Sequence, residues 1–294
     1  MVLPAYNEEE ALGPEIDKIR KVLDEAKIQY EIIVVNDGST DRTAEVAKSK
    51  NVRIVSHKKN RGNGAARKSG LLSATYDLVL NTDADGTYPA EQIPDMIRIM
   101  EEENSDMVVG ARIKESGTVS WIRLPAKLFI RKLASYLSKV KIPDLNSGLR
   151  IYRKSEVLKY FHMLPDSHSW VSTIILAFLC NNHRVDFVPV DYFPRSGGKS
   201  SFHPIKDTYN YLSLVIRTVM YFNPLRIFLP LTAMVFFIGS VKIIYDWIFY
   251  RFIGGVDVTL MLSGLLILVA GLLADLIVTV HRKTDAPMKF WDIK

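Results

Sequence analysis

The pattern of apolar and polar residues divides the chain into two parts. Over about the first 110 residues short apolar runs alternate with longer amphipathic stretches, whereas two long apolar runs fill most of the last quarter. A short apolar run bounded by polar residues is typical of a buried strand, and a stripe such as Ile16, Ile19 and Leu23 is typical of a helix. We therefore predict that strand and helix alternate five times, with the strands at residues 1–3, 32–35, 52–56, 78–80 and 106–112.

This alternation predicts the fold class. Repeated strand–helix units form a parallel sheet with right-handed crossovers and with helices on both faces. We expect an α/β, Rossmann-like fold with a mostly parallel, doubly wound sheet. Ligands of such sheets bind at the carboxyl ends of the strands.

The two long apolar runs, residues 225–249 and 258–280, predict a transmembrane hairpin. A bilayer core of about 30 Å needs about 20 helical residues, so both runs are long enough to cross it. The loop between them has one basic residue, whereas the opposite ends are basic, and positive residues favour the cytoplasmic side. We expect an integral plasma-membrane protein with its N-terminal domain and both termini in the cytoplasm, and the helices permit a homo-oligomer. The flanking basic residues are Arg217, Arg226, His281, Arg282 and Lys283.

Two amphipathic segments, residues 118–140 and 203–223, precede the hairpin. The first interleaves an apolar stripe with five basic residues and carries Trp121, a pattern typical of a helix in the membrane interface. A buried core helix shows similar stripes, so that alternative stays open. The predicted domains are thus 1–202, catalytic and including the first segment; 203–223, an interface helix; 224–281, the hairpin; and 282–294, a cytoplasmic tail.

Composition narrows the class of partner. The formal net charge of +6 is compatible with nucleic acid or with anionic lipid. Two predicted spans favour the lipid bilayer, and we expect no nucleic-acid partner. The one cysteine, Cys180, cannot form an internal disulfide and lies among apolar residues, which indicates packing. No signal peptide is visible at the start of the chain.

Candidate chemistry lies in the stretch from Asp77 to Pro89. An apolar strand ends there in Asp83, Ala84 and Asp85, at the edge of the sheet where ligands are expected. Mg²⁺ is commonly bound by one or two carboxylates together with substrate phosphates, so this turn is a candidate anchor for a metal-bound diphosphate. A solvated acidic turn is the alternative, because Asp and Gly are favoured in turns for local reasons.

Six ordered motifs carry a resemblance to a known family. PAYNEEE, VNDGSTD, NRGNGAA and DADGTYP resemble, in that order, the inverting GT-A glycosyltransferases of family 2. DLNSGLRIYRK (residues 144–154) and PRSGGKSSF (residues 194–202) resemble the subgroup that includes dolichyl-phosphate mannose synthase and bacterial polyprenyl-phosphate sugar transferases. The resemblance covers essentially residues 1–222 and implies a GT-A fold.

The resemblance implies a site for the nucleotide-sugar donor. The turn at Pro4 would face a nucleobase, Asp37 would accept a hydrogen bond from a base N–H, and glycines at the next turn would let the backbone approach a ligand at a helix N-terminus. The paired aspartates would hold Mg²⁺ or Mn²⁺ across the diphosphate. The donor-binding residues expected on this basis are Pro4, Ala5, Tyr6, Glu9, Asp37, Gly62, Asp83, Ala84 and Asp85, with Asp83 and Asp85 binding the metal.

This sequence departs from its relatives at two positions. Relatives of the mannose synthase type often have a further metal ligand two residues after the second aspartate, where this chain has Thr87, a poorer ligand. They also have a longer first strand, whereas only three residues precede Pro4. We expect either a start further upstream or an unusually short strand.

The acceptor side of the reaction needs positive charge rather than a base. A lipid monophosphate has a second pKa of about 6 and is already nucleophilic at pH 7. Basic side chains would bring it to the anomeric carbon beside the negative diphosphate. Asp144 would either orient these basic groups or remove a proton. The acceptor-phosphate residues expected are Arg112, Arg123, Arg195, Lys199 and Ser200, and the catalytic ones Asp85, Asp144, Arg150, Arg195 and Lys199.

These observations predict an inverting transferase that moves one sugar from a nucleotide-diphosphate sugar to a polyprenyl phosphate, dolichyl or undecaprenyl, at the cytoplasmic face. A processive polysaccharide synthase of the same fold is one alternative, but neither Gln29 nor Gln92 begins its Gln-x-x-Arg-Trp motif. A catalytically inactive sugar- or lipid-binding scaffold is the other. The intact acidic pair and the basic residues Arg195 and Lys199 argue against it.

Overall fold

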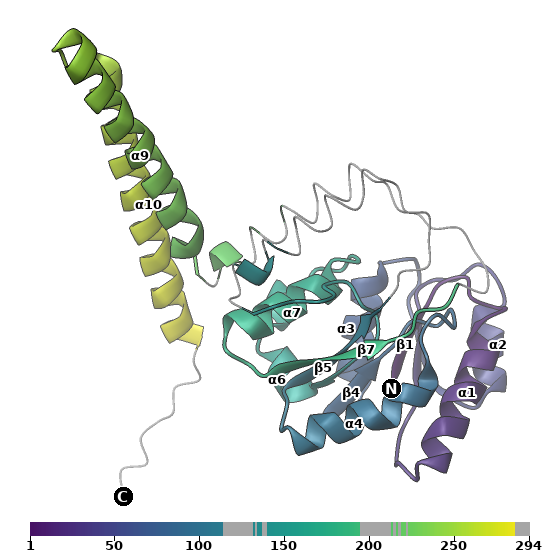
Figure 1. Cartoon of the computed structure of the whole chain (residues 1–294). Coiled ribbons are helices and arrows are strands. Elements are labelled where there is room, and N and C mark those ends of the chain that lie inside the picture. Colours follow the sequence, from purple (N-terminus) through teal and green to yellow (C-terminus); the bar gives the residue numbers. More distant parts are fainter. Residues whose placement is uncertain are drawn as a thin grey trace, which may run out of the picture. The chain divides into compact units, whose positions relative to one another are not determined.

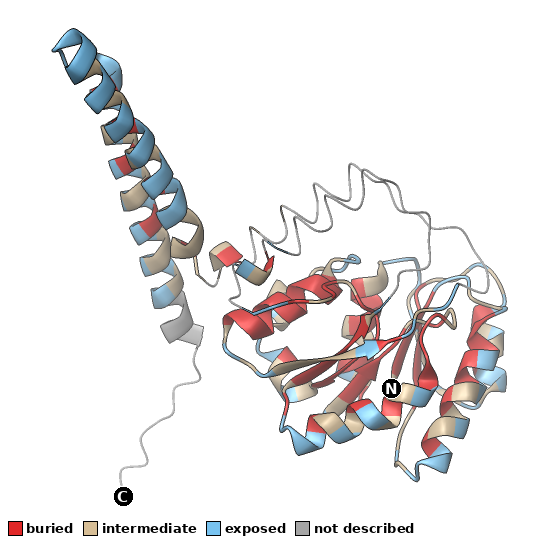
Figure 2. Ribbon diagram, in the orientation of Figure 1, coloured by how far each residue is buried: buried red, intermediate tan, exposed pale blue. Residues whose placement is uncertain are grey.

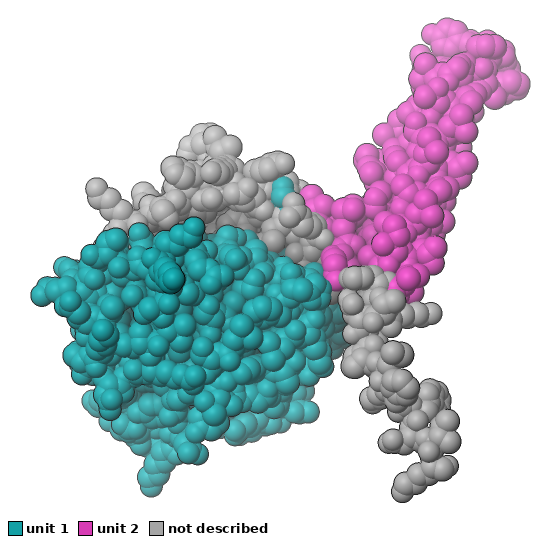
Figure 3. Space-filling view, turned by 180° about the vertical axis from the view of Figure 1, so that it is seen from behind, with its two compact units in different colours: residues 1–215 teal, residues 216–294 magenta. Residues whose placement is uncertain are grey.

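The computed structural model divides into two compact units, residues 1–215 and 216–294, which Figure 3 colours separately. The structure describes residues 1–113, 132, 134–136, 140–194, 213, 216, 219–221 and 223–285, the last five without their side chains. The interface helices predicted at 118–140 and 203–223 lie largely outside the described residues. The predicted boundary at residue 202 and most of the tail lie outside them as well.

The first unit contains a mixed, mostly parallel sheet (Figure 1). Its seven described strands run in the order β3-β2-β1-β4-β6-β5-β7, and only β6 pairs antiparallel with its neighbours. The predicted α/β class and mostly parallel sheet are confirmed, whereas β6 and β7 were not anticipated. The strands are β1 Val2–Ala5, β2 Ile33–Asn36, β3 Arg53–Ser56, β4 Leu78–Asn81, β5 Met107–Arg112, β6 Arg150–Arg153 and β7 Val185–Val190.

Helices cover both faces of this sheet, and Figure 2 shows α7 and the strands in the middle of the sheet as largely buried. The core cluster of buried apolar residues joins the sheet to α1, α2 and α4 on one face. Contacts with α3 and α7 lie on the other. The helices are α1 Leu12–Glu25, α2 Thr43–Ser49, α3 Asn63–Ser73, η1 Ala90–Gln92, α4 Ile93–Glu102, α6 Lys154–Leu158, η2 Phe161–Met163 and α7 Trp170–Cys180.

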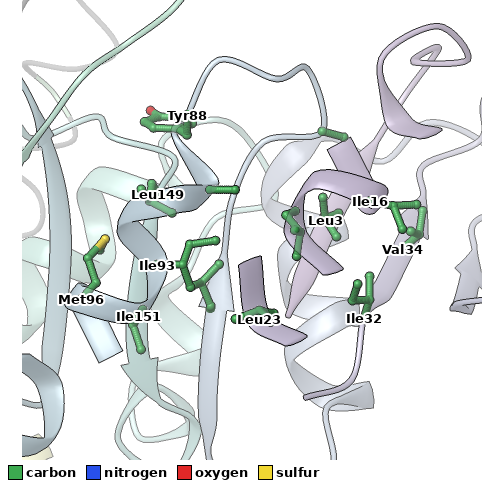
Figure 4. Packing of buried hydrophobic residues seen from close by; sticks show 14 of the residues in the cluster. Leu3, Ile16, Leu23, Ile32, Val34, Tyr88, Ile93, Met96, Leu149 and Ile151 are labelled. Atoms are coloured by element: carbon green, nitrogen blue, oxygen red, sulfur yellow. The ribbon is translucent and has the colours of Figure 1, made fainter. Parts of the chain in front are cut away.

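The short first strand shows how alternation distributes side chains between the two faces. Leu3 points into the cluster with Ile16 and Val34 (Figure 4). Val2 points to the opposite face, because successive side chains of a strand alternate. There α3 passes so close that a Cβ added at Gly70 would overlap the Val2 side chain. Four residues therefore suffice for a central strand that is fully buried on both faces.

The ends of β1, β2 and β4 define the edge on which the site is built. These strands are parallel, so the loops that follow them meet at the same edge of the sheet. β1 pairs with β2 over four residues but with β4 only at Val2 and Asn81, and the chain order reverses between β1 and β4. Such a switch point is where open α/β sheets bind ligands.

The second unit contains two long apolar helices, α9 Leu225–Tyr250 and α10 Gly255–Asp285. Both are long and apolar enough to cross a membrane, and little of either span is buried in the protein. Glycines allow them to pack closely, because a Cβ at Gly264 would lie 3.0 Å from the Phe236 ring and one at Gly271 would lie 2.5 Å from Phe228 Cβ. The predicted two-helix hairpin is present.

A charged cluster joins the two helices where the chain turns. Lys242 pairs with Asp246 on its own helix and lies 3.1 Å from Asp257 Oδ1 on α10. Asp257 also accepts a 2.7 Å hydrogen bond from the Gly254 amide. The sequence-based placement of Asp257 in the connecting loop was wrong, because α10 begins at Gly255.

Candidate active site

The turn after β4 places the two predicted metal-binding aspartates at the carboxyl edge of the sheet. Asp85 Oδ1 accepts a 2.7 Å hydrogen bond from the Thr87 hydroxyl and a 3.3 Å bond from the Thr87 amide. Asp83 Oδ1 accepts a 2.7 Å hydrogen bond from Arg67 Nη2. Ala84 between them is buried. Thr87 thus fixes the turn that presents Asp85, where the relatives often have a further ligand.

Arg67 of α3 is the principal site residue that the sequence did not reveal. Its guanidinium is buried and also donates to Asn63 Oδ1 at 2.7 Å and to the Gly148 carbonyl at 3.3 Å. The ring of Trp170 lies 5.7 Å from it. A charge-assisted hydrogen bond of this kind holds the Asp83 carboxylate in one orientation. The available signal was the spacing of Gly64, Arg67 and Leu71, which puts Arg67 on the buried face of its helix.

The loop before β6 packs directly on Asp83. A Cβ added at Gly148 would lie 2.8 Å from the Asp83 carboxyl carbon and nearer still to Oδ2. Only glycine therefore allows this backbone to reach the carboxylate. The Gly148 amide donates a 2.6 Å hydrogen bond to the buried Tyr88 hydroxyl, which fixes the loop from below. The structure thus joins the DADGTYP and DLNSGLR motifs in one site.

Asp144 and Arg112 form a buried bidentate ion pair. Arg112 donates from Nε to Oδ2 at 2.6 Å and from Nη2 to Oδ1 at 2.9 Å. Burial acts to raise the pKa of Asp144, but the hydrogen bonds and charge of Arg112 outweigh it and lower that pKa. The Arg112 guanidinium also lies 5.2 Å from the Tyr192 ring. An ionised carboxylate held in this way orients Arg112 and is a weak proton acceptor.

Arg150 lies below the site rather than in it. It has 0% exposure and donates to the backbone carbonyls of Val171, at 2.6 Å, and Ser147. Burial and the nearby charge of Arg67 lower its pKa to about 9. These contacts argue against the predicted direct contact with a phosphate. They indicate that Arg150 positions the loop that carries Gly148.

Hydrogen bonds join the loops after β1 and β2. Asn7 has φ 55°, and its amide donates a 3.0 Å hydrogen bond to the Ser39 hydroxyl. Its side-chain oxygen accepts from the Thr40 amide at 2.9 Å. Glu9 accepts from Arg42, both backbone and side chain. Tyr6 projects beside them with 44% of its surface exposed. An exposed aromatic at this edge is available to stack on a planar ligand.

The placement of Pro4 and Ala5 in a turn was wrong. Both belong to β1 and are buried, because the strand continues to Ala5 and its carbonyl accepts from the Asp37 amide at 2.9 Å. The turn that faces solvent therefore begins at Tyr6. Any contact of Pro4 or Ala5 with a ligand would come from the end of the strand.

Asp37 organises the loop at residues 58–62. It is 3% exposed, and its carboxylate accepts from the Arg61 amide at 2.9 Å, the Gly62 amide at 2.8 Å and His57 Nδ1 at 2.6 Å. Three donors on one carboxylate fix its orientation and hold the loop against the turn after β2. The predicted role of Asp37 toward a base N–H stays a prediction.

The glycines at the start of α3 approach protein rather than open space. Gly62 has φ 100°, and a Cβ there would lie 2.5 Å from the Asp166 carbonyl oxygen; one at Gly64 would lie 2.6 Å from that of Ser167. The Ala65 amide donates to the Asp166 carbonyl at 3.0 Å. Backbone from residues 165–167 thus fills the approach that the sequence had assigned to a ligand at Gly62.

The remaining predicted site residues lie outside the described part of the chain. They are Arg123, Arg195, Lys199 and Ser200. Their roles at the acceptor phosphate stay predictions. In contrast, Arg112 and Asp144 lie together next to the segment that carries Tyr192, whose ring contacts Tyr88 edge-on at 5.2 Å.

The acidic pair fits a metal that shares its ligands with a substrate. Among the residues that the structure describes, no group of three or more His, Cys, Asp or Glu side chains could hold a metal ion. Asp83 and Asp85 are each bound at Oδ1 by a protein donor, and two carboxylates completed by diphosphate oxygens suit Mg²⁺ or Mn²⁺. The donor set therefore fits a cation that binds together with a nucleotide diphosphate.

Comparison with curated proteins identifies similar sugar synthases and transferases. The chain is 27% identical to the dodecaprenyl-phosphate galacturonate synthase of Rhizobium johnstonii, over 97% of this chain and 89% of that protein. It is 29% identical to the dolichyl-phosphate hexose transferase of Haloferax volcanii, over 67% and 83%. It is 30% identical to the undecaprenyl-phosphate 4-deoxy-4-formamido-L-arabinose transferase of Edwardsiella ictaluri, over 70% and 63%.

Solved structures show the same fold. Glucosyl-3-phosphoglycerate synthase of Mycobacterium tuberculosis, solved with Mn²⁺, uridine diphosphate and phosphoglyceric acid, is 19% identical with a TM-score of 0.59, over 74% of this chain and 77% of that one. Mannosyl-3-phosphoglycerate synthase of Rubrobacter xylanophilus is 23% identical with a TM-score of 0.54, over 74% and 71%. The GT-A architecture predicted from the motifs is confirmed.

Two family models match separate parts of the chain. The model of the GtrB C-terminal hairpin matches residues 223–280, which include α9 and most of α10. The model of glycosyl transferase family 2 matches residues 1–161, more than half of the chain, and includes the acidic turn, Arg67, Arg112, Asp144 and Gly148. The chain therefore belongs to glycosyl transferase family 2.

Proposed function

We propose that this protein transfers one sugar from a nucleotide-diphosphate sugar to a polyprenyl phosphate at the membrane surface. The observation that carries the proposal is the union, in one chain, of a family 2 domain that presents Asp83 and Asp85 with an apolar hairpin. Relatives are named as a dodecaprenyl-phosphate galacturonate synthase and an undecaprenyl-phosphate sugar transferase, which supports a lipid phosphate as acceptor. The hairpin supplies the location where such an acceptor is found.

The donor side rests on the acidic turn. A structural neighbour was solved with Mn²⁺ and uridine diphosphate and another with Mg²⁺ and uridine diphosphate, which supports a divalent metal here. When bound, Mg²⁺ or Mn²⁺ would offset the charge that develops on the departing nucleotide diphosphate. Asp83 and Asp85 would hold it, while Arg67 and Thr87 keep both carboxylates oriented before substrate arrives.

The acceptor side rests on Arg112. Asp144 binds two of its nitrogens, and the Tyr192 ring lies beside the guanidinium, so its position is fixed by two partners. We infer that Asp144 orients this positive charge toward the acceptor phosphate rather than removing a proton. Arg123, Arg195, Lys199 and Ser200 are proposed to complete the phosphate-binding group. No general base is required, because the phosphate is already ionised at neutral pH.

The orientation in the membrane follows from charge. Basic residues flank α9 and α10 at the ends away from their connecting loop, which favours the cytoplasm for the family 2 domain. A cytoplasmic domain has access to nucleotide sugars, and the acceptor phosphate would be presented from the inner leaflet. Donor and acceptor would then meet at one surface.

The acidic pair provides the test of the proposal. Full-length protein in lipid vesicles is mixed with a panel of radiolabelled nucleotide sugars, Mg²⁺ and one short polyprenyl phosphate, and label in the lipid phase is counted. Asp85→Asn keeps the size of the side chain but removes the charge that binds a cation, so we expect transfer to fall by about 100-fold or more.

Asp95→Asn is the matched control, because Asp95 lies exposed on α4 and pairs only with Arg98 among the described residues. We expect transfer by this variant within about twofold of the wild type, as for most surface substitutions. Equal transfer by Asp85→Asn and the wild type would overturn the metal role. No lipid-linked label with any sugar of the panel would overturn the proposed reaction.

A further inference from the structure

A chain of three polar side chains, partly buried, lies beside the proposed nucleotide site. His57, directly after β3, makes a 2.6 Å contact through Nδ1 to Asp37 Oδ1 and a 2.8 Å contact through Nε2 to the Ser69 hydroxyl. Asp37 directly follows β2 and Ser69 lies on α3, so the imidazole links the ends of β2 and β3 to α3. Both His57 and Asp37 are almost fully buried. The proposed mechanism makes no use of His57.

The partners determine which nitrogen carries the proton. An ionised carboxylate only accepts hydrogen bonds, so His57 Nδ1 donates to Asp37. In the neutral imidazole, Nε2 then accepts from the Ser69 hydroxyl. The chain therefore runs in one direction, from Ser69 through His57 to Asp37.

This chain determines how Asp37 presents its two oxygens. Oδ1 accepts hydrogen bonds from both His57 and the Arg61 amide. Among the described residues, Oδ2 accepts a hydrogen bond only from the Gly62 amide. A carboxylate oxygen accepts two hydrogen bonds, so Oδ2 has capacity for one more donor. Rotation of the carboxylate would exchange the two oxygens, and the hydrogen bond from His57 opposes that rotation.

The same chain holds the loop at residues 58–62 against the turn after β2. Gly38 has φ 72°, and a Cβ there would lie 2.5 Å from the Lys59 carbonyl carbon, so the two backbones are in direct contact. Asp37 binds this loop through the amides of Arg61 and Gly62. Loss of the His57 contact would therefore loosen the carboxylate and the loop together.

We propose that His57 is a positioning residue for the donor nucleotide. By occupying Oδ1 of Asp37 it directs Oδ2 toward the N–H of a base such as uracil or guanine. This inference rests on the proposed function, because it requires the nucleotide to bind beside Asp37. His57 acts through Asp37 and touches no reacting atom, so it affects donor binding and not the rate of the chemical step.

The inference is tested by calorimetry on the full-length protein in detergent. The affinity for uridine diphosphate and for guanosine diphosphate is measured, each with Mg²⁺. For the nucleotide that the wild type prefers, we expect His57→Ala to weaken binding about 10-fold, the effect of losing one hydrogen bond to a charged group. In transfer assays KM for the donor rises by a similar factor while kcat stays within about twofold.

Two conservative variants separate positioning from simple packing. The side-chain amide of His57→Asn reproduces the Nδ1 donor, so binding returns to within about threefold of the wild type. The amide of His57→Gln lies at the Nε2 position, contacts Ser69 rather than Asp37, and leaves binding as weak as in His57→Ala. Should His57→Ala fail to fold, the comparison of Asn with Gln decides the question.

The chain offers a matched control in His183. Its Nδ1 lies 3.0 Å from Asp106 Oδ2 and its Nε2 lies 2.8 Å from the Tyr160 hydroxyl, the same arrangement at the amino ends of β5 and β7. His183→Ala is expected to lower the unfolding midpoint but to leave nucleotide affinity unchanged. Equal loss of affinity in His183→Ala and His57→Ala would overturn the positioning role.

The outcomes also distinguish this inference from the proposed function. If the wild type and His57→Ala bind nucleotide equally well, the inference is overturned and the proposed function stands. Weak binding by both His57→Asn and His57→Gln would likewise overturn it. A wild type that binds neither nucleotide and transfers no sugar would overturn the proposed function, and the inference with it.

Discussion

Two buried guanidinium groups lie under the acidic turn and are stabilised in different ways. Arg67 pairs with Asp83, whereas Arg150 donates to backbone carbonyls, and both lie within 5.8 Å of the Trp170 ring. Removing one partner of a buried ion pair commonly costs about 3–5 kcal/mol, because the other charge is left uncompensated. Asp83 is therefore bound in place by the fold itself. That arrangement favours a site oriented before its ligands arrive.

Glu15, in the first turn of α1, is a buried acid that makes stability depend on pH. It is 4% exposed, and burial, with the charges of Asp85 and Glu91, raises its pKa to about 7 although Lys18 acts to lower it. The folded protein therefore binds a proton that the unfolded chain releases at lower pH. The contribution of Glu15 to the free energy of unfolding is fully present below the ordinary pKa of a glutamate. It is lost as the pH rises through about 7, and it amounts to at most about 3 kcal/mol.

Glu15→Gln tests this dependence. As the pH is raised from 5 to 8, we expect the unfolding temperature of the wild type to fall relative to that of the variant, because glutamine carries no titrating proton. Scanning calorimetry at several pH values in one buffer strength measures both midpoints. The exposed Glu45→Gln, on α2, should follow the wild type. Parallel midpoints for the wild type and Glu15→Gln would show that Glu15 does not titrate in this range.

Individual residues were predictable where a motif concentrates them. Asp83 and Asp85 stand out because two carboxylates follow a buried strand, and Asp144 because its motif is specific. Arg67 and His57 do not, since a single basic residue on an amphipathic helix or after a strand is usually exposed to solvent. Their partners lie at residues 83, 148 and 37, and only the folded chain brings those positions together.

At the level of elements, the strands before residue 113 were predictable and β6 was not. Four of the first five strands are mostly buried apolar runs, which are typical of parallel sheets, and β3 at the edge has two apolar residues between Arg53 and Ser56. β6 begins and ends with arginine and has two apolar residues between, so its pattern does not indicate a strand. It forms because β4 and β5 leave a place between them, where it pairs antiparallel with both. Tertiary pairing, not local pattern, determines this element.

The loop that enters β6 gives a prediction about Gly148. Gly148→Ala places a Cβ against the Asp83 carboxylate, which is bound to Arg67 and cannot move freely. We expect transfer to fall by about 100-fold, because a displacement of about 1 Å at a site can cost that much. The unfolding midpoint should fall by only a few degrees, as for a typical local strain. Transfer assays and calorimetry on the same preparation measure both.

Gly13→Ala is the matched control for this substitution. A Cβ at Gly13, within α1, meets side-chain atoms only at 3.4 Å, an ordinary contact. Alanine is also favoured over glycine in a helix by about 0.5–1 kcal/mol. This variant should keep full transfer and gain slight stability. Full transfer by Gly148→Ala would show that the contact with Asp83 has no part in the reaction.

For the molecule as a whole, the hairpin is the part that needs a membrane. Its helices carry many exposed large apolar side chains, and water does not favour such a surface. Figure 2 shows most of the hairpin as exposed or intermediate. Lys242 pairs with both Asp246 and Asp257 where the two helices are connected, which reduces the cost of placing these charges in an apolar hairpin. Length and composition were sufficient to predict this unit, since both signals are local in sequence.

Topology supplies the last prediction, because charge around the hairpin favours one orientation. In a Cys180→Ser background, Arg251→Cys places a thiol in the connecting loop and Lys48→Cys places one on the exposed face of α2. A membrane-impermeant maleimide added to intact cells should label the first variant and not the second, and permeabilised cells should label both. The opposite pattern would put the family 2 domain outside the cell, away from nucleotide sugars, and would contradict transfer at the cytoplasmic face. Labelling of both variants in intact cells would show that the hairpin does not fix one orientation.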